Sequence, residues 1–225
     1  MRRETEPKRG TILLQSSYDP WQTGGLPFLN VAAVCSATRA LGPGLRAVVW
    51  VQGCCFQCKG CIAPDWAPFR KAHLISPERL AEALLCNSEV TGLTLSGGEP
   101  MLQALGLARL VQAARRHREL DVICYTGFTL EALRSRPPGP GVEELLAVTD
   151  VLIDGPYVEA FNDGRGLRGS SNQRVHFLTE RLRGVDLLTS PRRVEFHLGE
   201  GWLLLVGIPP RDLDLEALFT QNDSE

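Results

Sequence analysis

The stretch RAVVWVQGCCFQCKGC, residues 46–61, sets the fold of this chain because it joins a strand to a loop of cysteines. Its first six residues are apolar at nearly every position, which is typical of a strand buried on both faces of a sheet. The following ten residues hold four of the seven cysteines in the chain. Thiols at this density indicate a disulfide framework, a zinc site, a redox pair or the ligands of an iron–sulfur cluster.

Composition predicts a globular protein of the cytoplasm. The 225 residues are 44% hydrophobic and 22% charged, which is enough apolar material for one large domain with a proper core. No apolar run is long enough to span a bilayer and the charged N-terminus precedes no apolar segment, so we expect neither membrane association nor secretion. The formal net charge of −2 argues against nucleic-acid binding. Cytoplasmic thiols stay reduced, which disfavours the disulfide framework.

Strand and helix patterns alternate along the chain and predict an α/β fold with parallel strands and helical crossovers. Strands are expected at residues 28–34, 46–51, 91–95, 121–125 and 151–153. Helices are expected after Ser76, at about 101–117, after Thr129 and at 142–147, with Ser76 as an N-cap before Pro77.

Three regions are expected in this order. Residues 1–20 should be disordered or loosely packed, residues 21–180 should form the core of the fold, and residues 181–225 should pack on it as an extension. The extension is expected to contain a β-hairpin at residues 193–206 and a last helix near residues 213–219.

Polar segments follow four of the expected strands. Cys54 comes after the strand at 46–51, and SGGEP (residues 96–100) comes after the strand at 91–95. YTG (residues 125–127) lies at the end of the strand at 121–125, and Asp154 with its glycine comes after the strand at 151–153. In parallel α/β folds, ligands bind at the carboxyl ends of the strands. The four segments therefore predict a single site.

The cysteine spacing favours an iron–sulfur cluster. Cys54, Cys58 and Cys61 form a C-x3-C-x2-C pattern, and three thiolates so close together suit a cubane cluster with one iron left open for a substrate or cofactor. A structural zinc ion would need a fourth ligand, commonly from a second pair downstream, and no such pair follows. A zinc knuckle remains the alternative. Cys55 is expected to be a bystander.

Six stretches carry a resemblance to a known family: GPGLR at 42–46, GCCFQCKGC at 53–61, SGGEP at 96–100, YTGF at 125–128, DVLIDGPY at 150–157 and RGSSNQRVH at 168–176. On these residues the chain resembles radical S-adenosylmethionine (SAM) enzymes. More narrowly, it resembles the activating proteins of anaerobic (class III) ribonucleotide reductase, within the glycyl-radical-enzyme activases. The cysteine pattern and GGEP are shared by radical SAM enzymes at large, whereas GPGxR and RGSSNQ narrow the match.

The resemblance implies a partial (β/α)6 barrel with a [4Fe–4S] cluster on Cys54, Cys58 and Cys61, and SAM on the open iron. An external electron donor such as flavodoxin or ferredoxin would drive cleavage of SAM to methionine and a 5′-deoxyadenosyl radical. That radical would take a hydrogen atom from a backbone glycine of a large partner, a glycyl-radical enzyme. Cluster and SAM would carry this chemistry, so no side chain is required to act as a general acid or base.

The resemblance also implies a set of SAM-binding residues at the strand ends and in the cysteine loop: Gly60, Gly97, Gly98, Glu99, Thr126 and Asp154. Glu99 would accept hydrogen bonds from the ammonium group of SAM, and Gly97 and Gly98 would let the backbone approach its methionine part. Gly60 would leave room for the adenine ring. Asp154 would accept a bond from a ribose hydroxyl or help to orient SAM.

Two positions depart from the family pattern, and both lie near the expected SAM site. Ala63 stands where members commonly carry asparagine, and Pro156 stands where lysine is frequent. The chain also continues about fifty residues beyond RGSSNQ, which short reductase activases do not need. Two other functions therefore stay open: a radical SAM enzyme that modifies a small molecule or another protein, and a non-catalytic iron–sulfur or zinc module.

Overall fold

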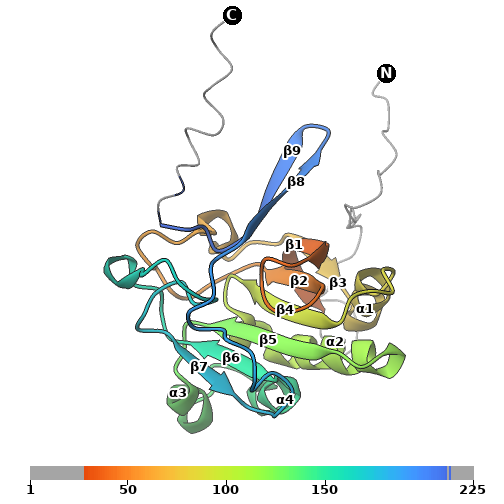
Figure 1. Cartoon of the computed structure of the whole chain (residues 1–225). Coiled ribbons are helices and arrows are strands. Elements are labelled where there is room, and N and C mark those ends of the chain that lie inside the picture. The colour runs from red at the N-terminus through yellow and green to blue at the C-terminus, as the bar shows by residue number, and fades with distance from the viewer. Residues whose placement is uncertain (1–27, 212, 214–225) are drawn as a thin grey trace, which may run out of the picture.

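A seven-stranded sheet forms the centre of the computed structural model, which describes residues 28–211 and residue 213 (Figure 1). Its strand order is β3-β1-β2-β4-β5-β6-β7. The strands are β1 (Leu29–Thr38), β2 (Arg46–Val51), β3 (His73–Ile75), β4 (Gly92–Gly97), β5 (Asp121–Thr126), β6 (Val151–Asp154) and β7 (Arg174–Phe177). The α-helices are α1 (Pro77–Leu84), α2 (Ala104–His117), α3 (Leu130–Ser135) and α4 (Val142–Val148). Short 3-10 turns occur at Pro64–Trp66, Pro100–Gln103 and Glu159–Phe161.

The middle of the sheet is parallel and its edges are antiparallel. Strands β2, β4, β5 and β6 pair in parallel, whereas β1 runs antiparallel to β2 and β7 runs antiparallel to β6. A parallel pair needs a crossover of a dozen or more residues, and the link between β1 and β2, residues 39–45, is too short for one. The α/β class is confirmed. The sheet has four parallel strands in its described part, so the partial (β/α)6 barrel remains a prediction.

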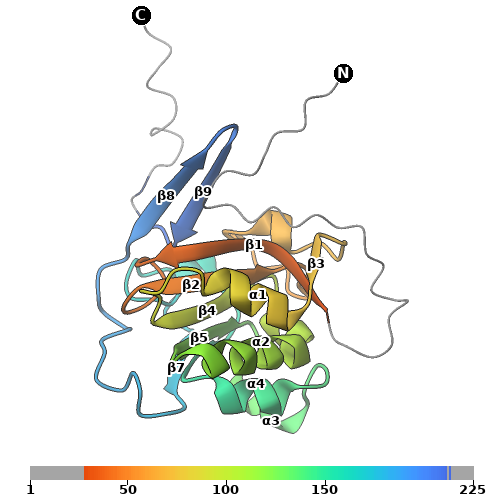
Figure 2. The same cartoon turned by 90° about the vertical axis from the view of Figure 1, so that its right-hand side faces the viewer.

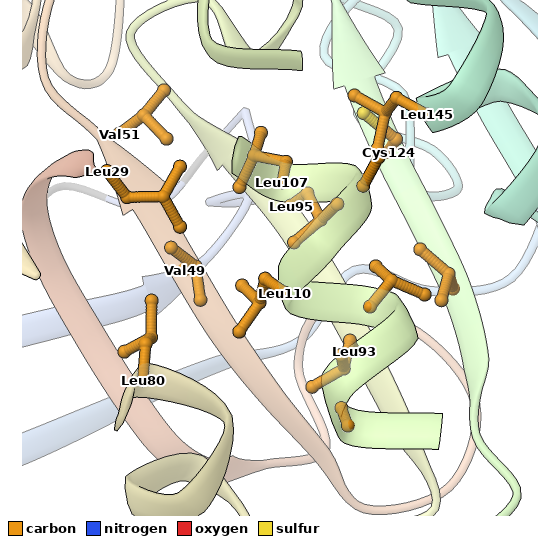
Figure 3. Close-up of a cluster of buried hydrophobic side chains, with 14 of the residues drawn as sticks. Leu29, Val49, Val51, Leu80, Leu93, Leu95, Leu107, Leu110, Cys124 and Leu145 are labelled. Carbon is orange, nitrogen blue, oxygen red and sulfur yellow. The ribbon is translucent and has the colours of Figure 1, made fainter. Parts of the chain in front are cut away.

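Helices cover one face of the sheet. Helix α2 contacts both α1 and α4, and all three pack on residues that alternate along the central strands (Figures 1 and 2). In β2, Val49 and Val51 face this layer with Leu110 of α2, as Figure 3 shows, while Val48 and Trp50 belong to a second cluster on the opposite face. Burying a valine side chain contributes about 2 kcal/mol, so apolar residues on both faces of β2 stabilise the fold.

Arg46 ties together the amino ends of three strands. Its buried guanidinium donates to Thr94 Oγ1 at 2.8 Å and to the carbonyl of Leu93 at 2.6 Å, and it forms an ion pair with Asp121. A Cβ at Gly92 would lie 2.3 Å from Arg46 Nη1, so the guanidinium requires glycine there. The arginine of GPGLR is therefore structural, and it lies at the opposite end of the strands from the polar segments.

The expected helix starts are confirmed by their caps. Ser76 Oγ accepts from the N–H of Arg79 at 3.4 Å, and Thr129 Oγ1 accepts from the N–H of Ala132 at 3.2 Å. The helix expected from residue 101 begins three residues later, because Pro100–Gln103 forms a 3-10 turn. The short strands β3 and β7 were not predicted. Residues 1–20 and the helix expected near 213–219 fall outside the described residues, apart from Leu213.

The expected hairpin is confirmed as a separate two-stranded sheet, β8 (Val194–Gly199) and β9 (Trp202–Gly207). It projects from the core in both views (Figures 1 and 2). The carboxylate of Glu195 holds its base by accepting from Thr38 Oγ1 at 2.7 Å and from the N–H of Arg39 at 2.8 Å. Across the residues that are described, no helix has both the length and the apolar character needed to span a membrane.

Candidate functional site

A pocket of about 730 Å³ opens at the carboxyl ends of the parallel strands. Its walls come from the cysteine loop after β2, residues 96–99 at the end of β4, residues 125–127 at the end of β5 and Gly155 after β6. Another wall is formed by the end of β9 and the segment that follows it. All of residues 204–211 except Val206 line the pocket there. The structure thus brings all four polar segments to one site, at the edge of the sheet where parallel strands place ligands.

Three of the clustered cysteines, Cys54, Cys58 and Cys61, line this pocket, and none of them forms a disulfide. Cys55 is exposed and does not line it. The backbone N–H groups of Gly53 and Cys54 each donate at 2.8 Å to the carbonyls of residues 66 and 67. These two hydrogen bonds close the cysteine loop without any bound ligand.

Phe56 fastens the cysteine loop to the end of β5. Its ring packs edge-to-face on Phe128 at a centroid distance of 4.9 Å, and it lies directly over Gly127. A Cβ at Gly127 would come within 2.5 Å of the Phe56 ring, so only glycine lets the ring settle there. The N–H of Phe56 also donates to Cys54 Sγ at 3.4 Å. This contact positions the first cysteine relative to the strand ends.

Burial affects the pKa of two of the three pocket thiols. Burial raises the pKa of Cys54 to about 11, and burial also raises the pKa of Cys58, so both are protonated at neutral pH without a metal. Bound iron deprotonates coordinating thiols outright. Within residues 28–211, no three His, Cys, Asp or Glu side chains stand close enough together to hold a metal as they are placed. Three soft sulfur donors on one pocket fit an iron–sulfur cluster by their chemistry.

Glu99 lies buried in the pocket wall with an exposed fraction of 1%. Its Oε1 accepts from the N–H of Met101 at 2.9 Å and from Thr126 Oγ1 at 2.8 Å, and its Oε2 accepts from the N–H of Gly127 at 2.8 Å. Burial raises the pKa of Glu99 to about 7, although these three bonds favour the carboxylate. A carboxylate accepts about four bonds, so Oε2 retains capacity for one more donor.

Gly97 and Gly98 are required by the protein backbone itself. Gly97 has φ +110°, and a Cβ there would lie 2.3 Å from the backbone N of Val51. A Cβ at Gly98 would lie 2.2 Å from the carbonyl oxygen of Gly53. Both glycines line the pocket, and their lack of side chains lets the end of β4 press against the start of the cysteine loop.

Gly60 lies in the pocket wall beneath Glu159. It has φ +72°, and a Cβ there would lie 2.8 Å from Glu159 Oε1. The neighbouring Lys59 forms an exposed ion pair with Glu159 at 3.4 Å. Ala63, at the position where the family commonly has asparagine, also lines the pocket.

Asp154 differs from the other expected SAM-binding residues because its side chain faces away from the pocket lining. It is fully buried, and its Oδ2 accepts from the N–H of Leu130 at 2.6 Å and from Arg174 Nη2 at 2.6 Å. Oδ2 also lies 3.0 Å from Nε2 of His176. Burial alone would raise the pKa of Asp154, but the bonds from Arg174 and Leu130 hold it below its ordinary value. The adjacent Gly155 lines the pocket in its place.

Comparisons with known proteins identify the family of this chain. The family model described as "4Fe-4S single cluster domain" matches residues 40–176. The anaerobic ribonucleoside-triphosphate reductase-activating protein of Vibrio cholerae serotype O1 is 33% identical over 148 residues, which cover 61% of this chain and 91% of that protein. The protein of the same name from Enterobacteria phage T4 is 33% identical over 60% of this chain and 85% of its own length. The one from Escherichia coli (strain K12) is 31% identical over 61% and 91%.

This chain belongs to the family of the anaerobic ribonucleoside-triphosphate reductase-activating proteins. The matched family model supports an iron–sulfur centre in this chain.

The family motif RGSSNQ has a structural role in this activating-protein homologue. Gln173 Oε1 accepts from the backbone N–H groups of Gly169 and Ser170, and Gln173 Nε2 donates to the carbonyl of Gly155 at 2.8 Å. Asn172 Nδ2 donates to the carbonyl of Pro156 at 2.8 Å. The motif therefore holds the segment after β6 in place by binding the backbone carbonyls of Gly155 and Pro156.

Sequence reasoning missed the wall that the C-terminal extension provides. Leu204, Leu205 and Arg211 line the pocket more than 140 residues after the cysteine loop. The hairpin itself was predicted, but its apolar pattern carries no signal of where it packs. Tyr157 also lines the pocket, and its place at the end of DVLIDGPY was the signal that could have identified it.

Proposed function

We propose that this protein is a radical SAM enzyme that cleaves SAM reductively at a [4Fe–4S] cluster and installs a glycyl radical on anaerobic ribonucleotide reductase. The observation that carries the proposal is the meeting of Cys54, Cys58 and Cys61 with Glu99 in one pocket at the carboxyl ends of the parallel strands. Family membership supports it, because the relatives are named activating proteins of that reductase.

The bound cofactors would supply the chemistry. With one electron from a donor such as flavodoxin or ferredoxin, cluster and SAM would provide a 5′-deoxyadenosyl radical, with methionine released, and this radical would take a hydrogen atom from a glycine of the reductase. The protein binds and orients the reactants and excludes water. Cys54, Cys58 and Cys61 would hold three irons of the cluster. The exposed Cys55 is left free.

Glu99 would bind the ammonium group of SAM through its remaining acceptor site. Thr126 fixes the carboxylate by donating to it, which makes Thr126 a positioning residue. The backbones of Gly97 and Gly98 would form the floor under the methionine part, and Gly60 would border the adenine ring. Asp154 would orient SAM through Gly155, because its own side chain is buried and does not line the pocket.

The shape and the setting of the site support the same proposal. A volume of about 730 Å³ lies within the range of pockets that hold cofactor-sized ligands. The four parallel strands are consistent with the partial (β/α)6 barrel that the family implies. Free thiols at the site suit a reducing compartment, and we place the protein in the cytoplasm on that ground.

Anaerobic reconstitution tests the proposal. The full chain is loaded with iron and sulfide, given SAM and dithionite, and assayed for 5′-deoxyadenosine beside a Cys58→Ala control. The expected result is 5′-deoxyadenosine from the wild type and none from the control. A protein that binds iron and reductase but neither binds nor cleaves SAM would overturn the proposal in favour of a non-catalytic iron–sulfur module.

Partner identity needs a second measurement. The loaded protein is mixed with the anaerobic reductase of the same organism, and the glycyl radical is followed by electron paramagnetic resonance. A doublet that depends on both SAM and Glu99 is expected. Abundant 5′-deoxyadenosine without any radical on the reductase would redirect the search to another substrate.

A further inference from the structure

The hairpin of β8 and β9 has an apolar face that is exposed toward the hairpin turn. In this antiparallel pair Phe196 lies opposite Leu205 and Leu198 lies opposite Leu203, so the four side chains share one face. We call them the apolar stripe. The other face carries Glu195 and Val206, which contact β1 and the cluster around Trp50. The solvent-facing side of an antiparallel sheet is ordinarily polar, and here it is not.

The stripe leads to the pocket. Leu198 and Leu203, near the hairpin turn, are 76% and 43% exposed, and Leu205 at the other end lines the pocket wall. Figures 1 and 2 show the hairpin standing out from the body of the protein with its turn farthest from the sheet. The stripe is therefore a continuous apolar track from the projecting tip to the mouth of the candidate site.

Three other exposed apolar side chains lie in or next to segments that line the pocket. Eight large apolar side chains are exposed in the described part of the chain, and four of them lie on the hairpin. Ile62 follows Cys61 and lines the pocket, Phe69 lies against Gly53 at the base of the cysteine loop, and Phe161 precedes the pocket residue Asn162. Apolar groups gathered in this way mark a surface that binds another macromolecule.

From this arrangement we infer that the apolar stripe is the docking surface for the partner enzyme, where an apolar part of the reductase next to its reacting glycine lies against Leu198 and Leu203. The inference rests on the proposed function. A reaction at a backbone glycine requires a folded partner to approach the pocket mouth, and the stripe borders that mouth. The family model ends at residue 176, so docking here is a feature of this chain beyond the matched core.

Charge distinguishes this partner from a membrane. Residues 194–207 contain no lysine or arginine, and their ionisable side chains are Glu195, His197 and Glu200. Anionic lipid surfaces attract cationic segments, which this hairpin lacks. An apolar protein surface is the occupant that suits it.

The test removes the stripe while keeping the hairpin paired. In the full-length protein, Leu198→Glu is combined with Leu203→Lys, because an opposite-charge pair across the strands preserves their pairing. The matched control is Leu188→Glu, which changes an exposed leucine outside the hairpin. Each protein is reconstituted, and three quantities are measured: iron content, 5′-deoxyadenosine formed with dithionite alone, and affinity for the reductase of the same organism.

The stripe variant is expected to keep its iron and its reductase-independent 5′-deoxyadenosine, and to bind the reductase at least tenfold more weakly than the wild type and the control. Wild-type affinity in the stripe variant would overturn the inference. A wild-type dimer that the variant dissolves would identify a second copy as the occupant and also overturn it. If the wild type cleaves SAM but neither binds the reductase nor gives it a radical, the proposed function fails, and the inference falls with it.

Discussion

The hydroxyl of Thr126 donates a 2.8 Å hydrogen bond to the buried carboxylate of Glu99, joining the ends of β5 and β4 across the candidate site. The same hydroxyl accepts from the N–H of Phe128 at 3.1 Å, so its orientation is set by the backbone of the YTGF turn. Two strand ends that are 27 residues apart in sequence thereby act as one unit.

Replacing Thr126 with valine should loosen Glu99 without changing the volume of the site. The lost hydrogen bond is expected to lower the free energy of unfolding by about 1 kcal/mol. SAM binding should weaken by roughly tenfold, which corresponds to about 1.4 kcal/mol. Equilibrium titration with SAM measures this, and Thr126→Ser, which keeps the hydroxyl, serves as control. Equal affinity in the valine and serine variants would remove Thr126 from the positioning role.

The buried Glu99 should make the metal-free protein less stable as the pH rises from about 4.5 to about 7. Its ordinary pKa is 4.5, and burial raises the pKa to about 7 in the folded state. Between those values the folded chain binds a proton that the unfolded chain releases, so the unfolding free energy falls with pH, by about 3 kcal/mol across the window. Urea denaturation at pH 5 and pH 8 measures the loss. Glu99→Gln should show a smaller loss; parallel stability curves for the two proteins would contradict the assignment.

Cluster binding should distinguish the four clustered cysteines. Cys58→Ala removes a pocket sulfur and is expected to abolish stable incorporation of a [4Fe–4S] cluster, because two protein thiolates are too few to hold it. Cys55→Ala changes an exposed thiol outside the pocket and should reconstitute like the wild type. Iron and sulfide analysis with Mössbauer spectra provides the measurement. Loss of the cluster in Cys55→Ala would make Cys55 a ligand.

The contact between Phe56 and Gly127 should couple the cysteine loop to β5. Gly127→Ala places a methyl group where the Phe56 ring now lies, and it is expected to lower the free energy of unfolding by about 1–3 kcal/mol and to shorten the lifetime of the cluster in air. Adding Phe56→Ala should relieve that clash, so the double variant should lose less than the sum of the single losses. Additive losses would show that the two residues act independently.

Removing the buried Arg46 should destabilise the fold without touching the site. Arg46→Ala leaves Asp121 and the carbonyl of Leu93 without their buried donor, which is expected to cost about 3–5 kcal/mol of unfolding free energy. Thermal or urea unfolding measures it, with the exposed Arg116→Ala as a control expected within about 0.5 kcal/mol of the wild type. A large loss of SAM affinity at unchanged stability would contradict the structural role.

The local features of this protein were determined by its sequence. The apolar run from Ala47 to Val51 predicted a doubly buried strand, and Ser76 and Thr129 predicted the starts of two helices. These predictions succeed because burial on both faces and end-capping depend on residues a few positions apart. The cysteine spacing and the polar strand ends likewise indicated one site, because parallel strands end at the same edge of a sheet.

Other features were decided only by the tertiary structure, because they depend on contacts between residues far apart in the chain. The carboxylate of Asp154 is occupied by Arg174, which comes twenty residues later, so a strand-end aspartate that resembles a ligand faces away from the pocket. Gly97 and Gly98 owe their identity to the backbone of Val51 and Gly53. The hairpin was predicted as a hairpin, but only folding places Leu205 against the site. A hydrophobic pattern specifies which side chains are buried, and the packing of the whole chain specifies what they are buried against.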